Sequence, residues 1–204
     1  PTRGADHWNN MVIAQNNAAE LFSPDPKAAE KFRSQGFTSA LIVPQRGIIK
    51  GKSAVVNLGD GKGNDVLVRS NVAHHIQLAG EFGREGYPGS LFGIIALIRQ
   101  ALYDADWYNK AHDAYAKNPS LQRPETNEAL AALRDVIPAS GTGVNKIPVV
   151  IETNDELDVF RANKIAQEFG LNLIVRGSGK SVTAPAAFSA RRTSVWLPGS
   201  SRPT

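Results

Sequence analysis

The 204-residue chain contains no cysteine. This absence excludes disulfides, a cysteine nucleophile and thiolate-bound metal centres. Long hydrophobic runs are missing too: the longest, Leu91–Ile98, has eight residues. Because a helix needs roughly 20 apolar residues to cross a bilayer, we expect no membrane-spanning segment.

Acidic residues are missing from the end of the chain, where the last one is Glu168. Beyond Gly179 every charged side chain is basic: Lys180, Arg191, Arg192 and Arg202. Without these four of the 23 basic residues, positions 1–179 balance 19 basic against 19 acidic side chains. The body is therefore neutral. Because the basic end carries no regular interleaving of cations and aromatics, we expect no nucleic-acid partner.

Composition divides the chain into two parts. Residues 1–179 alternate predicted helices and strands, whereas residues 180–204 are rich in Ser, Pro and Ala and show no sustained periodicity. We predict one domain over 1–179 and an irregular basic tail over 180–204. Two interpretations of the tail stay open: a disordered or loosely packed terminus, or a departure from the parent reading frame near Lys180.

Periodicity and turn residues predict the elements of the first part. Asp25 and Pro26 are typical of a helix start, so a helix is expected over Lys27–Gln35. Further helices are predicted over 90–117, 126–136 and 153–169. Apolar runs bounded by turn residues predict strands over 38–44, which we expect to be buried, within 52–57, on either side of Ser70–Asn71, and at 148–152 and 173–176.

The stretch at 148–179 reads PVVIETNDELDVFRANKIAQEFGLNLIVRGSG, a strand, a helix and a strand. Thr153 with Glu156 fits a helix capping box, and Gly170 stands where a left-handed C-cap residue belongs. This order predicts a right-handed crossover between two parallel strands, and hence an α/β fold. In parallel α/β barrels the carboxyl ends of strands carry the catalytic groups.

Four residues are candidates for the rim of a pocket: Glu152, Glu81, His75 and Arg176. A rim carboxylate can bind a metal ion or act as a base, although Glu152 can also favour the dipole of the helix that follows it. Of the neighbours His74 and His75 only one can face a given pocket, because successive strand residues point to opposite faces. No nucleophile elbow or complete phosphate-binding loop is present.

Several stretches together resemble the amidohydrolase superfamily, in particular the imidazolonepropionase-related amidohydrolases of bacteria. The resemblance covers about residues 1–179 and is carried by DHWNNMV, FRSQGFTSALIVPQRGIIKGKSAVVNLGDG, YPGSLFGIIALIRQALYDADWY, RPETNEALAALRDVI and PVVIETNDELDVFRANKIAQEFGLNLIV. It implies part of a metal-dependent (β/α)8 TIM-like barrel that hydrolyses amide-type C–N bonds, with zinc or another divalent metal polarising the scissile carbonyl.

The metal-ligand pattern that the resemblance implies is missing. No His-x-His motif occurs, Glu152 stands where the fifth barrel strand would place a histidine, and Gly177 where the sixth would. The resemblance therefore implies a degenerate, non-catalytic portion of a larger hydrolase, with no catalytic residue and no cofactor in this chain. The alternative is a fragment of an active metal-dependent amidohydrolase that uses Glu152, Glu81 and one histidine of the 74–75 pair.

An incomplete barrel would leave open sheet edges and uncovered apolar faces. We therefore expect this chain to require the missing barrel segments or a second amidohydrolase domain of the parent protein as its partner. Oligomerisation is a further way to cover the same surfaces.

Overall fold

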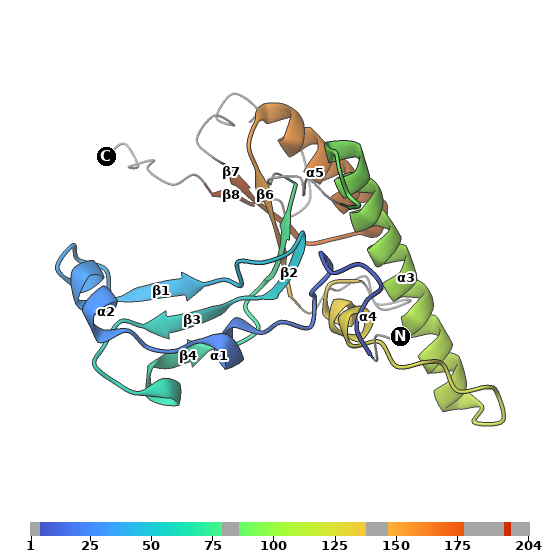
Figure 1. Cartoon of the computed structure of the whole chain (residues 1–204), viewed down its shortest axis with the longest axis horizontal. Coiled ribbons are helices and arrows are strands. Elements are labelled where there is room, and N and C mark those ends of the chain that lie inside the picture. The colour runs from blue at the N-terminus through green and yellow to red at the C-terminus, as the bar shows by residue number, and fades with distance from the viewer. Residues whose placement is uncertain (1–4, 79–85, 138–146, 178–193, 197–204) are drawn as a thin grey trace.

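A computed structural model describes residues 5–78, 86–137, 147–177 and 194–196, which form an α/β fold with two sheets (Figure 1). The three-stranded sheet has the order β1–β3–β4, and the five-stranded sheet has the order β2–β5–β6–β7–β8. The strands are β1 (Ser39–Ile42), β2 (Ile49–Lys52), β3 (Ala54–Asn57), β4 (Leu67–Arg69), β5 (His74–Gln77), β6 (Val149–Thr153), β7 (Leu173–Gly177) and β8 (Ser194–Trp196). The helices are α1 (Ala18–Leu21), α2 (Pro26–Arg33), α3 (Leu91–Lys117), α4 (Glu128–Ala132) and α5 (Glu156–Phe169), with 3-10 turns η1 (Gly63–Val66) and η2 (Leu133–Asp135).

The smaller sheet is antiparallel and extends away from the long helix α3 (Figure 1). Its strand β1 corrects the prediction of a buried strand at 38–44, because Ser39 and Leu41 are exposed and the residues between and after them are only half-buried. The reason is position: β1 is an edge strand that pairs with β3 alone. Helix α2 begins as predicted, with the Asp25 carboxylate accepting from two backbone N–H groups.

The larger sheet carries the predicted parallel crossover. Strands β5, β6, β7 and β8 run parallel in that order, and α5 connects β6 to β7. The antiparallel strand β2 borders β5, and a single residue, Ser53, separates it from β3 of the other sheet. β8 lies within the predicted tail; residues 178–193 and 197–204 lie outside the described part, so the boundary at 179 stays a prediction.

The helices cover one face of the larger sheet. Strand residues that point to this face alternate along β6 and β7 and pack against α3 and α5 in one apolar core. The core includes Ile76, Val149, Ile151, Leu173, Val175, Leu97, Ile98, Leu102 and Ile165. The other face, called here the inner face, carries the side chains of His75, Val150, Glu152, Ile174 and Arg176. None of the described helices is long and apolar enough to cross a membrane.

Helix boundaries follow capping groups. The Ser90 side chain caps α3, and Gly170, at φ 63°, ends α5 in the left-handed conformation that the sequence predicts for it. The predicted capping box at Thr153 is wrong, because Thr153 is the buried last residue of β6 and the side chain of Asp155 accepts from the helix instead. The helix predicted over 126–136 is shorter, with α4 capped by Asn127 and continued by the 3-10 turn η2.

Candidate functional site

A group of charged and polar side chains meets on the inner face of the larger sheet. Register places Glu152 of β6 directly beside Arg176 of β7, and the Arg176 Nη1 lies 3.2 Å from Glu152 Oε1. From β2, the Lys50 ammonium donates to Glu152 Oε2 over 2.9 Å. His75 of β5 completes this inner-face cluster, with Nδ1 3.9 Å from Glu152 Oε1. One carboxylate therefore joins three strands through two cations.

The Glu152 carboxylate stays ionised in this environment although its side chain is only 19% exposed. Burial raises the pKa of Glu152, but the neighbouring His75 and Lys50 and the charge of Arg176 outweigh burial and lower the pKa to about 2. Glu152 is therefore a stable anion at neutral pH. A group that holds its proton so weakly is a poor general base.

The two neighbouring histidines face opposite sides of the sheet, as strand alternation requires. His74 points into the helix-covered core, where its Nε2 lies 3.2 Å from the Ala132 carbonyl oxygen. Burial and the nearby Lys52 lower the pKa of His74 to about 4. His75 points to the inner face and is 1% exposed, and neither of its ring nitrogens has a hydrogen-bond partner in the described part of the chain.

The structure brings together three of the four candidate residues. Glu152, His75 and Arg176 form one cluster, whereas Glu81 lies outside the described residues. Lys50 was not a candidate from sequence, although it contacts Glu152 more closely than either of the others. The one sequence signal for Lys50 was a lysine between the strand residues Ile49 and Gly51. Its partner Glu152 is 102 positions away, so the sequence did not relate the two.

The inner-face cluster does not fit a divalent metal ion. Both oxygens of Glu152 are engaged by cations, and a metal ion at this carboxylate would meet the positive charges of Lys50 and Arg176. Among the described residues, no group of three histidines or carboxylates is placed to hold a metal. Within the described part of the chain, His75 is the one imidazole close to Glu152, and two ligands fall short of the four-coordinate shell that zinc prefers.

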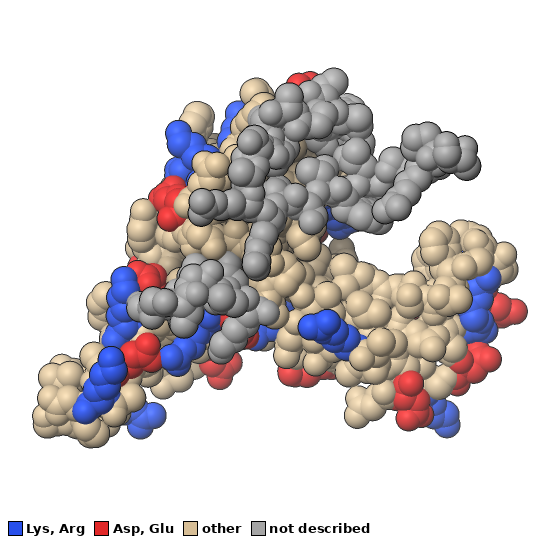
Figure 2. Space-filling view, turned by 180° about the vertical axis from the view of Figure 1, so that it is seen from behind, with Lys and Arg blue, Asp and Glu red and all other residues tan. Residues whose placement is uncertain are grey.

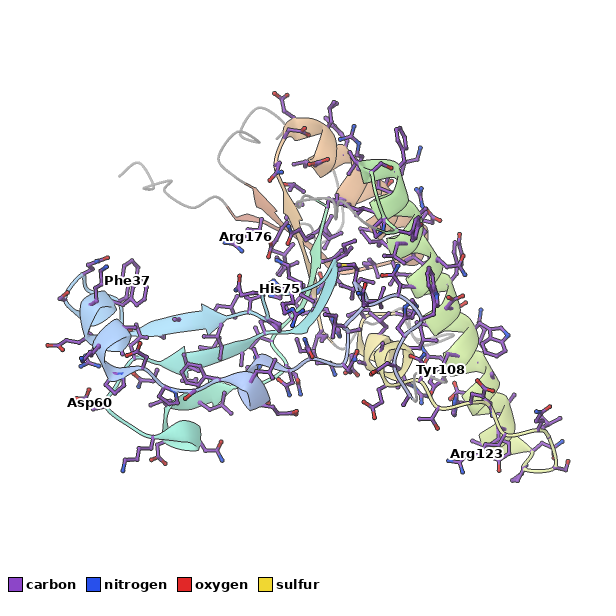
Figure 3. The ribbon with its side chains drawn as sticks, viewed as in Figure 1. Phe37, Asp60, His75, Tyr108, Arg123 and Arg176 are labelled. Atoms are coloured by element: carbon purple, nitrogen blue, oxygen red, sulfur yellow. The ribbon has the colours of Figure 1, made fainter. Side chains whose placement is uncertain are left out.

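A cavity of about 910 Å³ lies between the inner face and β1 of the smaller sheet. Leu41, Ile42 and Val43 line one side, and Val150 and Ile174 line the other. His75 and Arg176 also line it, so the cavity and the cluster share two residues. The labelled His75 and Arg176 both lie on the side of the sheet away from α3 (Figure 3).

The face of the molecule that Figure 2 draws shows no field of one sign among the described residues. In the face drawn in Figure 2, acidic and basic side chains are interspersed among uncharged residues rather than gathered in a broad basic patch. Binding to a nucleic-acid backbone relies on such a patch. The expectation of no nucleic-acid partner remains a prediction.

The fold is similar to that of a solved amidohydrolase from Thermotoga maritima MSB8. The two structures match with a TM-score of 0.70 at 21% sequence identity, and the match covers 84% of this chain and 45% of that one. The chain thus has an amidohydrolase-like fold and spans less than half the length of that protein. No protein-family model matches the sequence, and no curated protein matches it.

Proposed function

We propose that this chain is a non-catalytic, amidohydrolase-like portion of a larger hydrolase. The observation that carries the proposal is the state of Glu152, whose two carboxylate oxygens are held by Lys50 and Arg176. In this proposal an internal ion-pair cluster takes the place that a metal centre has in active relatives.

The charges of the cluster favour a structural role. A catalytic metal needs ligands that are anionic or neutral, whereas this cluster offers two cations and one anion. The side chain of Lys50 is 6% exposed, so its charge depends on Glu152 for compensation. Removing one partner of such a buried pair costs about 3–5 kcal/mol, because the other charge is left uncompensated. The ion pairs of the cluster thus connect β2, β6 and β7 and stabilise their arrangement.

We further propose that the larger sheet is part of a (β/α)8 TIM-like barrel of the imidazolonepropionase-related type. Four parallel strands in consecutive order and helices on one face support this proposal. Parallel sheets are normally covered on both faces. The similar amidohydrolase chain is more than twice as long as the matched part, so further barrel segments or a second amidohydrolase domain of the parent protein are the proposed partners. Assembly into an oligomer would cover the same face.

One observation favours a second function, in which this chain is a fragment of an active metal-dependent amidohydrolase. His75 is buried with both ring nitrogens unpartnered among the described residues, and it lies 3.9 Å from Glu152 Oε1. Imidazole and carboxylate are the ligand types that zinc uses in hydrolases. In this alternative Glu81 would be the third ligand, and Lys50 would have to leave the carboxylate. Cleavage of an amide or cyclic amide bond would follow from the metal.

Metal analysis of the purified chain separates the two functions. The protein is equilibrated with zinc, dialysed and analysed by mass spectrometry together with the Glu152→Ala variant. The exposed Glu125 provides a matched control as Glu125→Ala. We expect all three proteins to retain far less than one zinc per chain. One zinc per chain in the wild type and in Glu125→Ala, lost in Glu152→Ala, would overturn the non-catalytic proposal.

A further inference from the structure

The walls of the cavity beside the inner-face cluster are apolar. Leu41, Ile42 and Val43 face Val150 and Ile174 across a space of about 910 Å³, which lies in the size range of small-molecule sites. Leu41 is 48% exposed, which is a large apolar surface for a strand residue. The apolar run at 41–43 is thus not a core strand. It forms one wall of the cavity.

Two polar groups reach the same cavity without full compensation. The Arg176 side chain is 49% exposed and directs one of its five N–H donors to Glu152, so its other donors are open to a ligand or to solvent. His75 is almost completely buried and has no hydrogen-bond partner for either ring nitrogen within the described residues. Because buried polar atoms are normally paired, an unpartnered His75 that lines a cavity indicates a missing partner.

The site carries a net positive charge. Lys50 and Arg176 together exceed Glu152 by one positive charge, and Arg176 is the only charged residue among those that line the cavity in the described part. Apolar walls favour an apolar body, and a cationic, donor-rich end favours an anion. We propose that this cavity binds a small apolar carboxylate, with its hydrocarbon against Leu41, Val150 and Ile174 and its carboxylate at Arg176 and His75.

The cavity runs along the inner face from the amino ends of the strands towards Arg176, the second-to-last residue of β7. The cavity extends to Val72 and Pro148, which precede β5 and β6 and so lie at the amino ends of these strands. Active sites of barrel enzymes lie at the opposite, carboxyl ends. The apolar part of the site thus reaches the amino ends, whereas its cationic end at Arg176 adjoins Glu152 near the carboxyl ends. Because binding at this site needs no metal ion and no catalytic step, the proposal does not rest on the proposed function.

Calorimetric titration of the full 204-residue chain tests the proposal with two probes of equal length, octanoate and its neutral analogue octanamide. We expect octanoate to bind at least about tenfold more tightly, because a charge-assisted hydrogen bond to Arg176 is available only to the anion. In Arg176→Gln the preference for octanoate should disappear. Arg123→Gln is the matched control, since Arg123 is exposed and lies far from the cavity beyond the end of α3 (Figure 3).

A second variant addresses the apolar wall. Ile174→Phe places a larger side chain in the cavity and should weaken both probes while circular dichroism shows an intact fold. Equal binding of octanoate and octanamide would overturn the proposal, as would unchanged octanoate affinity in both Arg176→Gln and Ile174→Phe. Absence of octanoate binding to the folded wild type up to about 1 mM would also overturn it.

Discussion

Replacing Glu152 with glutamine tests whether the ion-pair cluster stabilises the fold. The substitution keeps the shape of the side chain but removes the charge, as protonation would. In the wild type the pKa of Glu152 is lowered from 4.5 to about 2. Because the folded state binds this proton more weakly than the unfolded chain, ionised Glu152 stabilises the fold above about pH 4.5. This stabilisation is lost as the pH falls towards 2.

The magnitude follows from the pKa difference. One pKa unit corresponds to 1.36 kcal/mol, so a difference from 4.5 to about 2 amounts to about 3 kcal/mol at neutral pH. This value agrees with the cost of breaking a buried ion pair, about 3–5 kcal/mol. The Lys50 side chain is 6% exposed and that of Glu152 19%, so solvent screens this pair little, whereas the half-exposed Arg176 contributes less to the total.

Urea unfolding followed by circular dichroism, from about pH 7 down to about pH 2, measures the effect. The quantity of interest is the difference in unfolding free energy between wild type and Glu152→Gln, since contributions common to both cancel. We expect a gap of about 3 kcal/mol at pH 7 that closes between about pH 4.5 and 2. The control Glu125→Gln should differ from wild type by less than about 0.5 kcal/mol throughout.

A gap that is absent at pH 7, or that stays constant down to about pH 2, would refute this reasoning. Should the chain unfold before Glu152 titrates, the carbon NMR signal of its carboxyl group in the folded protein gives a second measurement. A Glu152 that titrates near its ordinary value of 4.5 would contradict the cluster as described.

Further predictions concern the packing around the site. In Gly51→Ala the new methyl would lie 2.2 Å from the Asn16 carbonyl oxygen, at a φ of +103°. We therefore expect urea unfolding to show a free energy of unfolding lower by more than about 3 kcal/mol. In the control Gly36→Ala, with φ +91° and open space around the methyl, it should fall by only about 1–2 kcal/mol. Leu97→Ala, at a fully buried core position, should lose about 2–5 kcal/mol in the same assay. Since the pKa of His74 is lowered to about 4, the wild type should lose stability as the pH falls from 6.5 to 4, and unfolding curves of His74→Gln should lack this loss.

Local patterns in the sequence predicted the parallel crossover of β6, α5 and β7. Apolar residues every third or fourth position, the run VVIE and a terminal glycine at 170 are signals that need no distant partner. Pattern alone failed at β1, because the run at 38–44 is as apolar as a core strand. Its position at a sheet edge, beside a cavity, depends on pairing with β3 and cannot be derived from the run itself.

The candidate site was predictable only in part for the same reason. Glu152 and Arg176 were found because each ends a strand of the same crossover. The sequence did not predict Lys50 as a site residue, because it contacts Glu152 from an antiparallel strand that is 102 positions away in the chain. No local rule of spacing relates two such residues, so the cation that decides the chemistry of Glu152 becomes visible only in three dimensions.

Strand register links the cluster to the fold itself. Because strand residues alternate between faces, one of His74 and His75 must lie on the inner face. Both are buried, so burial does not distinguish them. The pairing of β5 with β6 decides which one lies beside Glu152. A slip of β6 by one residue would turn Glu152 into the apolar core beside the helices, away from Lys50 and Arg176. An uncompensated carboxylate buried there would cost far more free energy than an apolar residue moved by the same slip. The cluster thus specifies the register of the parallel strands, a structural role that does not depend on whether the parent protein is catalytic.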